Sequence, residues 1–146
     1  KNSILNISSC DIAFDYDKKK YNKFLSKYDS FIWTYKNNRN LENPEDYGWI
    51  KTFKNSCVVK YVSCKKPLKS NTIGDYIVSG AFTFKNSNEF FKSVKKMIKK
   101  NDRVNNEFYV DNIFNHNKLN NSVFEVEKYF SWGTPKELKL YLNNEI

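Results

Sequence analysis

The longest strand-like segment of the chain runs from Tyr76 to Phe84, and it limits the chain to folds built around a β-sheet. Aromatic and β-branched residues follow one another there, a composition typical of a central strand. Gly80 interrupts the segment, and a glycine within a strand often marks the close approach of a ligand or of another backbone. Strand-like and helix-like segments follow one another over the rest of the chain. The sequence therefore predicts an α/β fold, with α+β as the alternative, built on a mixed sheet flanked by helices.

Hydrophobic periodicity gives the expected positions of the other elements. Strands are expected at residues 3–8, 31–35, 47–53, 57–63 and 122–127. Helices are expected at residues 18–28, 88–99, 107–115 and 135–142, and loops at 11–17, 37–46 and 65–75. No internal repeat or long linker divides the chain, so we expect residues 1–146 to form a single domain.

The net charge of +9 comes almost entirely from lysine, because Arg39 and Arg103 are the only arginines. Nucleic-acid-binding domains rely on arginine forks and on a concentrated basic face. The densest lysine cluster, at residues 92–100, is interleaved with apolar residues, as on the solvated face of an amphipathic helix. The charge thus argues against nucleic acid as a partner and is compatible with an anionic small substrate.

The three cysteines, Cys10, Cys57 and Cys64, form no C-x-x-C pair. This pattern argues against a disulfide framework or a cysteine-based zinc site, and it is typical of a cytoplasmic protein. The single histidine, His116, has no serine or cysteine motif beside it, and we expect it to be structural. No apolar run approaches the roughly 18 residues of a membrane span, so no membrane partner is expected.

A strongly specified helix start lies near the C-terminus. Thr134 is expected to cap the helix, with Pro135 at its first position and Glu137 completing a capping box. The N–H groups of such a start suit a phosphate or a sugar hydroxyl. The alternative is an ordinary capped surface helix, with Trp132 covering the core.

Several short segments in a fixed order carry a family resemblance. They are Asp11 after the first strand, Tyr47-Gly48-Trp49-Ile50, Lys65-Lys66-Pro67, the Gly80 strand, Asn106-Glu107-Phe108-Tyr109-Val110-Asp111 and Trp132-Gly133-Thr134-Pro135. The set resembles the C-terminal, substrate-side portion of the sugar-phosphate nucleotidylyltransferase family, of the capsule or surface-polysaccharide type. It is also similar to phosphocholine cytidylyltransferases. The resemblance implies a partial GT-A/Rossmann-like nucleotidyltransferase fold and transfer of a nucleotidyl group from an NTP to a sugar 1-phosphate or similar phosphate.

The resemblance also implies roles for individual residues. Asp11 matches the catalytic aspartate that holds Mg²⁺, and Lys66 matches a catalytic lysine that neutralises the acceptor phosphate. The remaining matches imply substrate binding, with Glu107 left open between binding substrate and capping a helix. These residues are Tyr47, Gly48, Ser79, Gly80, Glu107, Trp132, Gly133 and Thr134.

Three departures from the family pattern matter. Lys65 replaces a sugar-binding glutamate, and Ser131 replaces a second metal-binding aspartate, for which Asp111 is a candidate substitute. The glycine-rich loop that would hold the NTP phosphates is absent. We therefore expect the chain to be the C-terminal portion of a longer enzyme, inactive on its own, with the N-terminal portion of that enzyme as a partner.

Two other functions stay open. Asp15-Tyr16-Asp17 matches the D-x-D metal motif of a GT-A glycosyltransferase, although these residues also suit the acidic start of a helix at Lys18. A non-enzymatic basic module for anionic glycan or nucleic acid is the other alternative. Because part of a sheet leaves an exposed edge, we also expect self-association.

Overall fold

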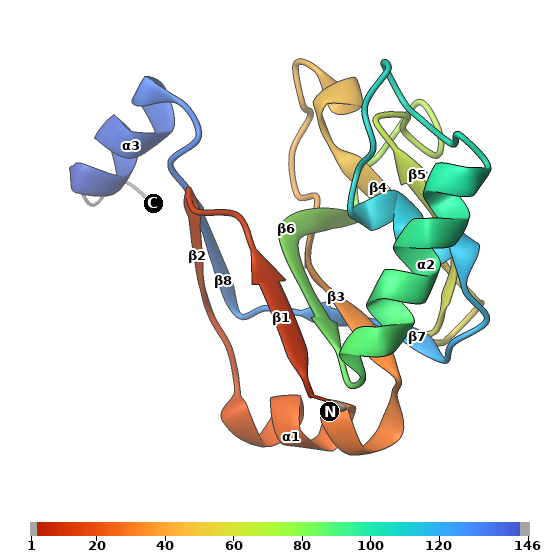
Figure 1. Ribbon diagram of the computed structural model, residues 1–146. Coiled ribbons are helices and arrows are strands. Elements are labelled where there is room, and N and C mark those ends of the chain that lie inside the picture. The colour runs from red at the N-terminus through yellow and green to blue at the C-terminus, as the bar shows by residue number, and fades with distance from the viewer. Residues whose placement is uncertain (1–2, 144–146) are drawn as a thin grey trace.

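A mixed sheet with helices packed against it forms the body of the protein, as Figure 1 shows for the computed structural model, which describes residues 3–143. The strand order is β5 (Val59–Cys64), β4 (Gly48–Thr52), β6 (Tyr76–Phe84), β3 (Ser30–Lys36) and β7 (Asn121–Glu125). A further strand, β1 (Leu5–Ser8), pairs with β6. The β3–β7 pair is parallel and the other pairs of this sheet are antiparallel. The predicted α/β fold with a mixed sheet is confirmed.

Gly80 lies where β6 changes its neighbour on one edge. Before it, Tyr76 and Ile77 pair with β4, and after it, residues 81–84 pair with β1. Gly80 has a φ of +93°, which favours glycine, and a Cβ there would lie 2.8 Å from Ser9 Oγ. The Ser9 N–H also donates to the Gly80 carbonyl over 3.0 Å. The close approach observed at this glycine is therefore that of another backbone.

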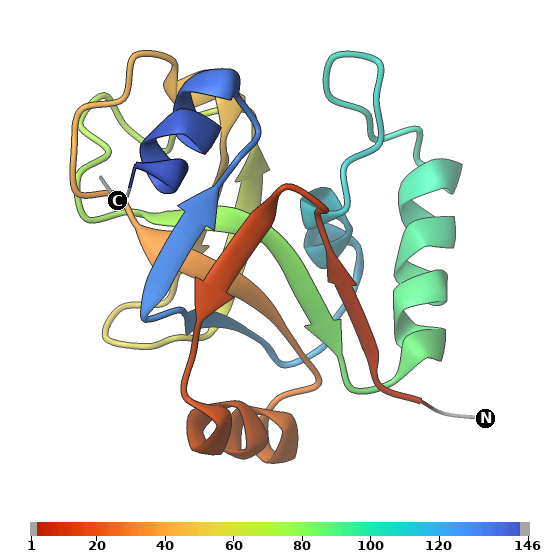
Figure 2. The ribbon, with the colours of Figure 1, turned by 90° about the vertical axis from the view of Figure 1, so that its left-hand side faces the viewer.

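Two hydrophobic clusters lie on the two faces of the sheet. One contains Phe82, Phe84 and Met97 and joins the sheet to α2 (Ser87–Lys99) and to a 3-10 helix at Asp111–His116. The other is aromatic and joins the sheet to α1 (Lys18–Lys27). Figure 2 shows these elements in a view turned from that of Figure 1.

The sequence does not predict the second, two-stranded sheet, because it indicates a loop at residues 11–17 and no strand at residues 128–131. β2 (Ile12–Asp15) pairs antiparallel with β8 (Lys128–Ser131), so the prediction of a loop at residues 11–17 is wrong. The partner strand is distant in the sequence, and the pairing leaves no local signal. Ile12 and Phe14 of β2 pack against the aromatic cluster. This small sheet leads into α3 (Pro135–Leu142), whose predicted bounds are confirmed.

The predicted helix at residues 107–115 is also wrong in its first half. Asn105 and Asn106 both have positive φ angles, 51° and 65°, and Val104 and Glu107 exchange backbone hydrogen bonds in a tight turn. Helical structure begins only at Asp111 and takes the 3-10 form. Glu107 therefore caps no helix. Within residues 3–143, no helix is long and apolar enough to cross a membrane.

Candidate functional site

A cleft of about 530 Å³ opens between the end of β3, the loop after it, and the β8–α3 segment. Tyr35, Arg39, Tyr47, Tyr129, Ser131 and Glu137 are among the residues that line it. A smaller hollow of about 290 Å³ shares Arg39, Tyr47 and Glu137 with the cleft and adds Thr134 and Asp46. The two hollows therefore adjoin each other, and their lining residues include the predicted site residues Tyr47 and Thr134.

Three tyrosines form the wall of the cleft. The rings of Tyr35 and Tyr129 stack with centroids 4.2 Å apart and planes inclined by 11°. Burial raises the pKa of Tyr129 to about 12 and also raises the pKa values of Tyr35 and Tyr47 above the ordinary value. All three phenols are therefore neutral at physiological pH and can donate hydrogen bonds to a bound ligand.

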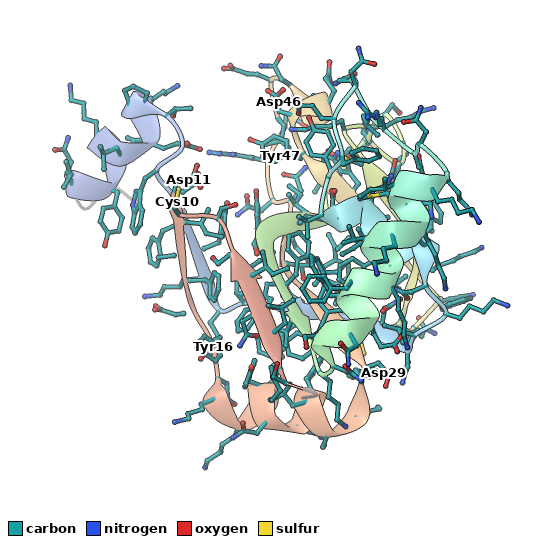
Figure 3. The ribbon with its side chains drawn as sticks, viewed as in Figure 1. Cys10, Asp11, Tyr16, Asp29, Asp46 and Tyr47 are labelled. Atoms are coloured by element: carbon teal, nitrogen blue, oxygen red, sulfur yellow. The ribbon has the colours of Figure 1, made fainter. Side chains whose placement is uncertain are left out.

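Asp11 lies in the turn between β1 and β2, beside the closing motif of the sequence. The N–H of Trp132 donates to the Asp11 carbonyl over 2.8 Å. A Cβ on Gly133 would lie 3.0 Å from Asp11 Oδ2, 3.7 Å from Glu137 Oε2 and 3.8 Å from Ser131 Oγ. Figure 3 shows Asp11 and Tyr47 at the same end of the molecule. The fold thus brings Asp11, Trp132 and Gly133 together beside Ser131 and Glu137 of the cleft.

The start of α3 has the predicted capping box. Glu137 Oε2 accepts the Thr134 N–H over 3.0 Å, and Thr134 Oγ1 accepts the Glu137 N–H over 3.2 Å. The predicted cap is confirmed. The Glu137 carboxylate already lies against this helix start, so an anion approaching it meets a negative charge as well as the helix dipole.

The donors around Asp11 fit a magnesium ion that takes part of its coordination shell from elsewhere. Asp11 is exposed, and the Glu137 carboxylate and the Ser131 hydroxyl also lie within 4 Å of the position that a Cβ on Gly133 would take. No group of three or more His, Cys, Asp or Glu side chains within residues 3–143 could hold a metal. Mg²⁺ commonly binds through one or two carboxylates together with substrate phosphates and retained waters. Asp11 fits such a site as its protein carboxylate.

Asp111 differs from the exposed Asp11 in that its carboxylate is buried inside the protein. It is buried, with 7% of its surface exposed, and it shares a hydrogen bond with the Cys64 thiol. Burial raises the pKa of its carboxyl group above the ordinary value. A Cβ on Gly48 would collide with Asp111 Oδ2, so this glycine makes room for the carboxylate. The hypothesis that Asp111 replaces the missing metal ligand is therefore wrong, since its carboxylate packs against Gly48 and Cys64.

Among the predicted site residues, only Tyr47 and Thr134 line the cleft or the adjoining hollow, and Lys66 and Glu107 are two of those that do not. Lys66 is exposed after β5, and its carbonyl accepts the Ser63 hydroxyl over 2.7 Å. Glu107 is exposed and accepts the Tyr109 hydroxyl over 2.6 Å. Within residues 3–143, no hydrogen bond or ion pair joins either side chain to Asp11 or Gly133. Their roles toward substrate stay predictions.

Ser79 and Gly80 lie inside β6. Ser79 is 2% exposed, and its Oγ has no hydrogen-bond partner within residues 3–143. The environment of Gly80 is that of a close backbone contact with Ser9. Substrate binding by either residue stays a prediction.

The D-x-D hypothesis is wrong, because Asp17 is the N-cap of α1. Its carboxylate accepts the N–H groups of Lys19 over 2.6 Å and Lys20 over 3.3 Å. In Figure 3, Tyr16 lies at the α1 end of the molecule, away from Asp11. The acidic start of a helix is therefore the confirmed interpretation of this segment.

Tyr35, Tyr129 and Arg39 line the cleft although none of them was predicted from the sequence as a site residue. Arg39 is the one of the three that carries a charge. It was noted only as one of two arginines, although its position in an Asn-rich loop directly after a buried strand was a usable signal. The other residue singled out by its rarity, His116, is 8% exposed and lies 2.7 Å from Asp102 through Nε2. That contact supports its expected structural role.

Comparisons with known proteins identify the fold. No family model matches the chain, and no curated protein matches it by sequence. A solved nucleoside-diphosphate-sugar pyrophosphorylase from Vibrio cholerae RC9 is similar, with a TM-score of 0.74 and 14% identity over 98% of this chain and 57% of that one. HddC from Yersinia pseudotuberculosis, also solved in complex with GMP-PN, is similar with a TM-score of 0.61 and 14% identity over 99% of this chain and 56% of its own. The chain thus adopts a sugar-nucleotidyltransferase-like fold and spans slightly more than half the length of the proteins that share it.

Proposed function

We propose that this chain is the acceptor-side portion of a nucleotidyltransferase. The reaction is transfer of a nucleotidyl group from an NTP to a sugar 1-phosphate or a similar phosphate, with release of pyrophosphate. The observation that carries the proposal is the placement of Asp11 beside Gly133, next to a tyrosine-walled cleft, in a chain of nucleotidyltransferase-like fold. Finer parts of the proposal are a cytoplasmic location and a role in making surface-polysaccharide precursors.

Nucleotidyl transfer depends more on the positioning of the two substrates than on acid–base catalysis. A phosphate monoester has a second pKa of about 6, so the attacking oxygen is already ionised at neutral pH. The barrier is then lowered by holding the acceptor in line and by neutralising charge. The neutral phenols of Tyr35, Tyr47 and Tyr129 would donate hydrogen bonds to oxygens of the acceptor substrate. The carboxylates that line the cleft would accept hydrogen bonds from hydroxyl groups of the same substrate.

Asp11 would hold Mg²⁺ in this proposal. Mg²⁺ held there would supply charge neutralisation for the reacting phosphates. The serine hydroxyl at position 131 would orient retained water or substrate beside it. We place the triphosphate on residues outside this sequence, because the sequence has no glycine-rich loop to cradle it.

The experiment has a metal readout and an activity readout. Mn²⁺ is titrated into the chain in place of Mg²⁺, and paramagnetic broadening is followed in the NMR spectrum. We expect broadening around Trp132 and Gly133 that Asp11→Asn removes and that the control Asp15→Asn, at another exposed aspartate, retains. Broadening that is identical in both variants would remove Asp11 from the metal site.

Activity is measured on the full-length protein that carries this sequence. We expect pyrophosphate release from an NTP only when a phosphorylated acceptor is present, with a loss on the order of a hundredfold in Asp11→Asn. Asp15→Asn should keep the wild-type rate. Hydrolysis of a nucleotide sugar without any activity on NTPs would contradict the proposal and favour a glycosyltransferase.

A further inference from the structure

The cleft contains a cation that the described chain leaves unpaired. Arg39 lines both the cleft and the adjoining hollow. Within residues 3–143, no hydrogen bond or ion pair holds its guanidinium group, and only its backbone N–H donates, to Asn37 Oδ1 over 3.3 Å. The second cation of the cleft, Lys36, instead lies over the Tyr76 ring at 5.2 Å. Of the two cations that line the cleft itself, Arg39 is therefore the one that remains available to a ligand, while Lys136 lines only the adjoining hollow.

Two of the carboxylates that line the cleft, Glu137 and Glu125, already have partners of their own. Glu137 accepts both the N–H and the hydroxyl of Thr134, over 3.0 and 3.1 Å. Glu125 shares a hydrogen bond with the Tyr76 hydroxyl. The positive charge of Arg39 acts instead on the phenols beside it, where it opposes the rise in the pKa values of Tyr35 and Tyr47. Arg39 thus shares the cleft with neutral hydroxyl donors.

A guanidinium group among hydroxyl donors matches a phosphoryl group. Arginine presents a planar fork of N–H donors that binds two phosphate oxygens at once, and the charge assistance strengthens each hydrogen bond. The start of α3 is a weaker candidate, since Glu137 occupies its Thr134 N–H. Lys66, the cation expected from sequence, does not line the cleft.

We infer that Arg39 binds the phosphoryl group of a phosphate monoester whose body lies against Tyr47. This inference deepens the proposed function, because that phosphate would be the one carried by the acceptor. It adds a binding residue that lies in the loop between β3 and β4, outside every motif on which the sequence-based expectation of a site rested.

The experiment uses the two arginines of the chain as internal probe and control. Each arginine gives one side-chain Nε–H resonance, so the ¹⁵N NMR spectrum has two such signals to follow. The chain is titrated at neutral pH, without NTP or metal, with glucose 1-phosphate and separately with inorganic phosphate. We expect a saturable shift of the Arg39 signal and no shift of the Arg103 signal, because Arg103 already donates to Asn101 and lies over Phe108.

Variants at Arg39 then measure how much its guanidinium group contributes to the affinity for glucose 1-phosphate. Arg39→Gln should weaken glucose 1-phosphate binding about tenfold or more, as the loss of a charged hydrogen-bonding partner does. Arg39→Lys should recover part of the affinity, since it restores charge without the bidentate geometry. Arg103→Gln should bind as the wild type does. Unchanged affinity in Arg39→Gln, or an equal loss in Arg103→Gln, would overturn the inference.

The comparison of glucose 1-phosphate with inorganic phosphate tests whether the bound ligand is a phosphate monoester. Tighter binding of glucose 1-phosphate than of inorganic phosphate supports contact between Tyr47 and the body of the ligand, and equal affinities would contradict it.

The inference and the proposed function can be disproved separately. Phosphate binding through Arg39 without any nucleotidyl transfer by the full-length protein would sink only the proposed function. Transfer with an unchanged KM for the acceptor in Arg39→Gln would sink only the inference.

Discussion

The backbone N–H of Trp132 donates to the carbonyl oxygen of Asp11 over 2.8 Å and ties the first turn of the chain to its last motif. The pairing of β2 with β8 brings these two residues together across nearly the whole sequence. The carboxylate of Asp11 then lies against Gly133, where no side chain intervenes. The candidate metal position therefore depends on a small glycine at 133.

Replacing this glycine tests that dependence. Gly133→Ala places a Cβ about 3.0 Å from Asp11 Oδ2, closer than side-chain atoms usually approach one another. We expect the carboxylate to be displaced and Mn²⁺-induced broadening at Trp132 to weaken, while the melting temperature changes little because Gly133 is exposed. Broadening equal to that of the wild type would show that the carboxylate position is not critical.

The capping box should stabilise α3. Thr134→Ala removes the hydroxyl that accepts the Glu137 N–H, and N-cap losses of this kind cost about 1 kcal/mol. We expect a lower helix content by circular dichroism and faster amide exchange in residues 136–138, with α2 unaffected. Asn86→Ala, at the N-cap of α2, is the matched control and should reverse the pattern between the two helices. Equal exchange in α3 with and without the hydroxyl would contradict the prediction.

Gly48 and Asp111 should be energetically coupled. A methyl group at position 48 collides with Asp111 Oδ2, so we expect Gly48→Ala to lower the free energy of unfolding by about 2 kcal/mol. Much of that loss should disappear when Gly48→Ala is made in an Asp111→Ala background, because the colliding atom is gone. Urea unfolding of the four proteins measures the coupling, and additive effects would contradict the contact.

Asp111 should also make stability depend on pH. Burial raises the pKa of its carboxyl group in the folded state above the ordinary value of 3.8. Between the unfolded and the folded pKa, the folded protein binds more protons than the unfolded one, so stability falls as the pH rises through this window. We expect Asp111→Asn to remove that decline. Parallel pH–stability curves for wild type and variant would show that Asp111 does not titrate as described.

The open edge of β1 predicts self-association of the isolated chain. β1 pairs only with β6 in the described sheet, and no lysine or proline within Leu5–Ser8 protects its other edge. Ser8→Lys should reduce association in sedimentation velocity at high concentration. Ser70→Lys, which adds the same charge at another exposed serine outside the strands, should not. A monodisperse wild-type monomer would contradict the prediction.

Local chemistry determined much of this protein from the sequence alone. The Thr134 capping box, the helix after Asp17 and the strand at Tyr76–Phe84 each follow from neighbouring residues, and all three were predicted correctly. The similarity to solved structures supports the fold that the family resemblance implied, while the roles of Asp11 and Tyr47 stay predictions.

Only the tertiary structure decided what lies around those positions. The strand β2 was not predicted because it is stabilised by pairing with β8, which is distant in the sequence. The prediction of a helix at residues 107–115 was wrong because Asn105 and Asn106 adopt positive φ angles. The packing of the Asp111 carboxylate against Gly48 and the position of Arg39 in the cleft both depend on contacts between separate elements. A short segment encodes its own caps and periodicity, whereas packing partners are chosen by the whole chain at once.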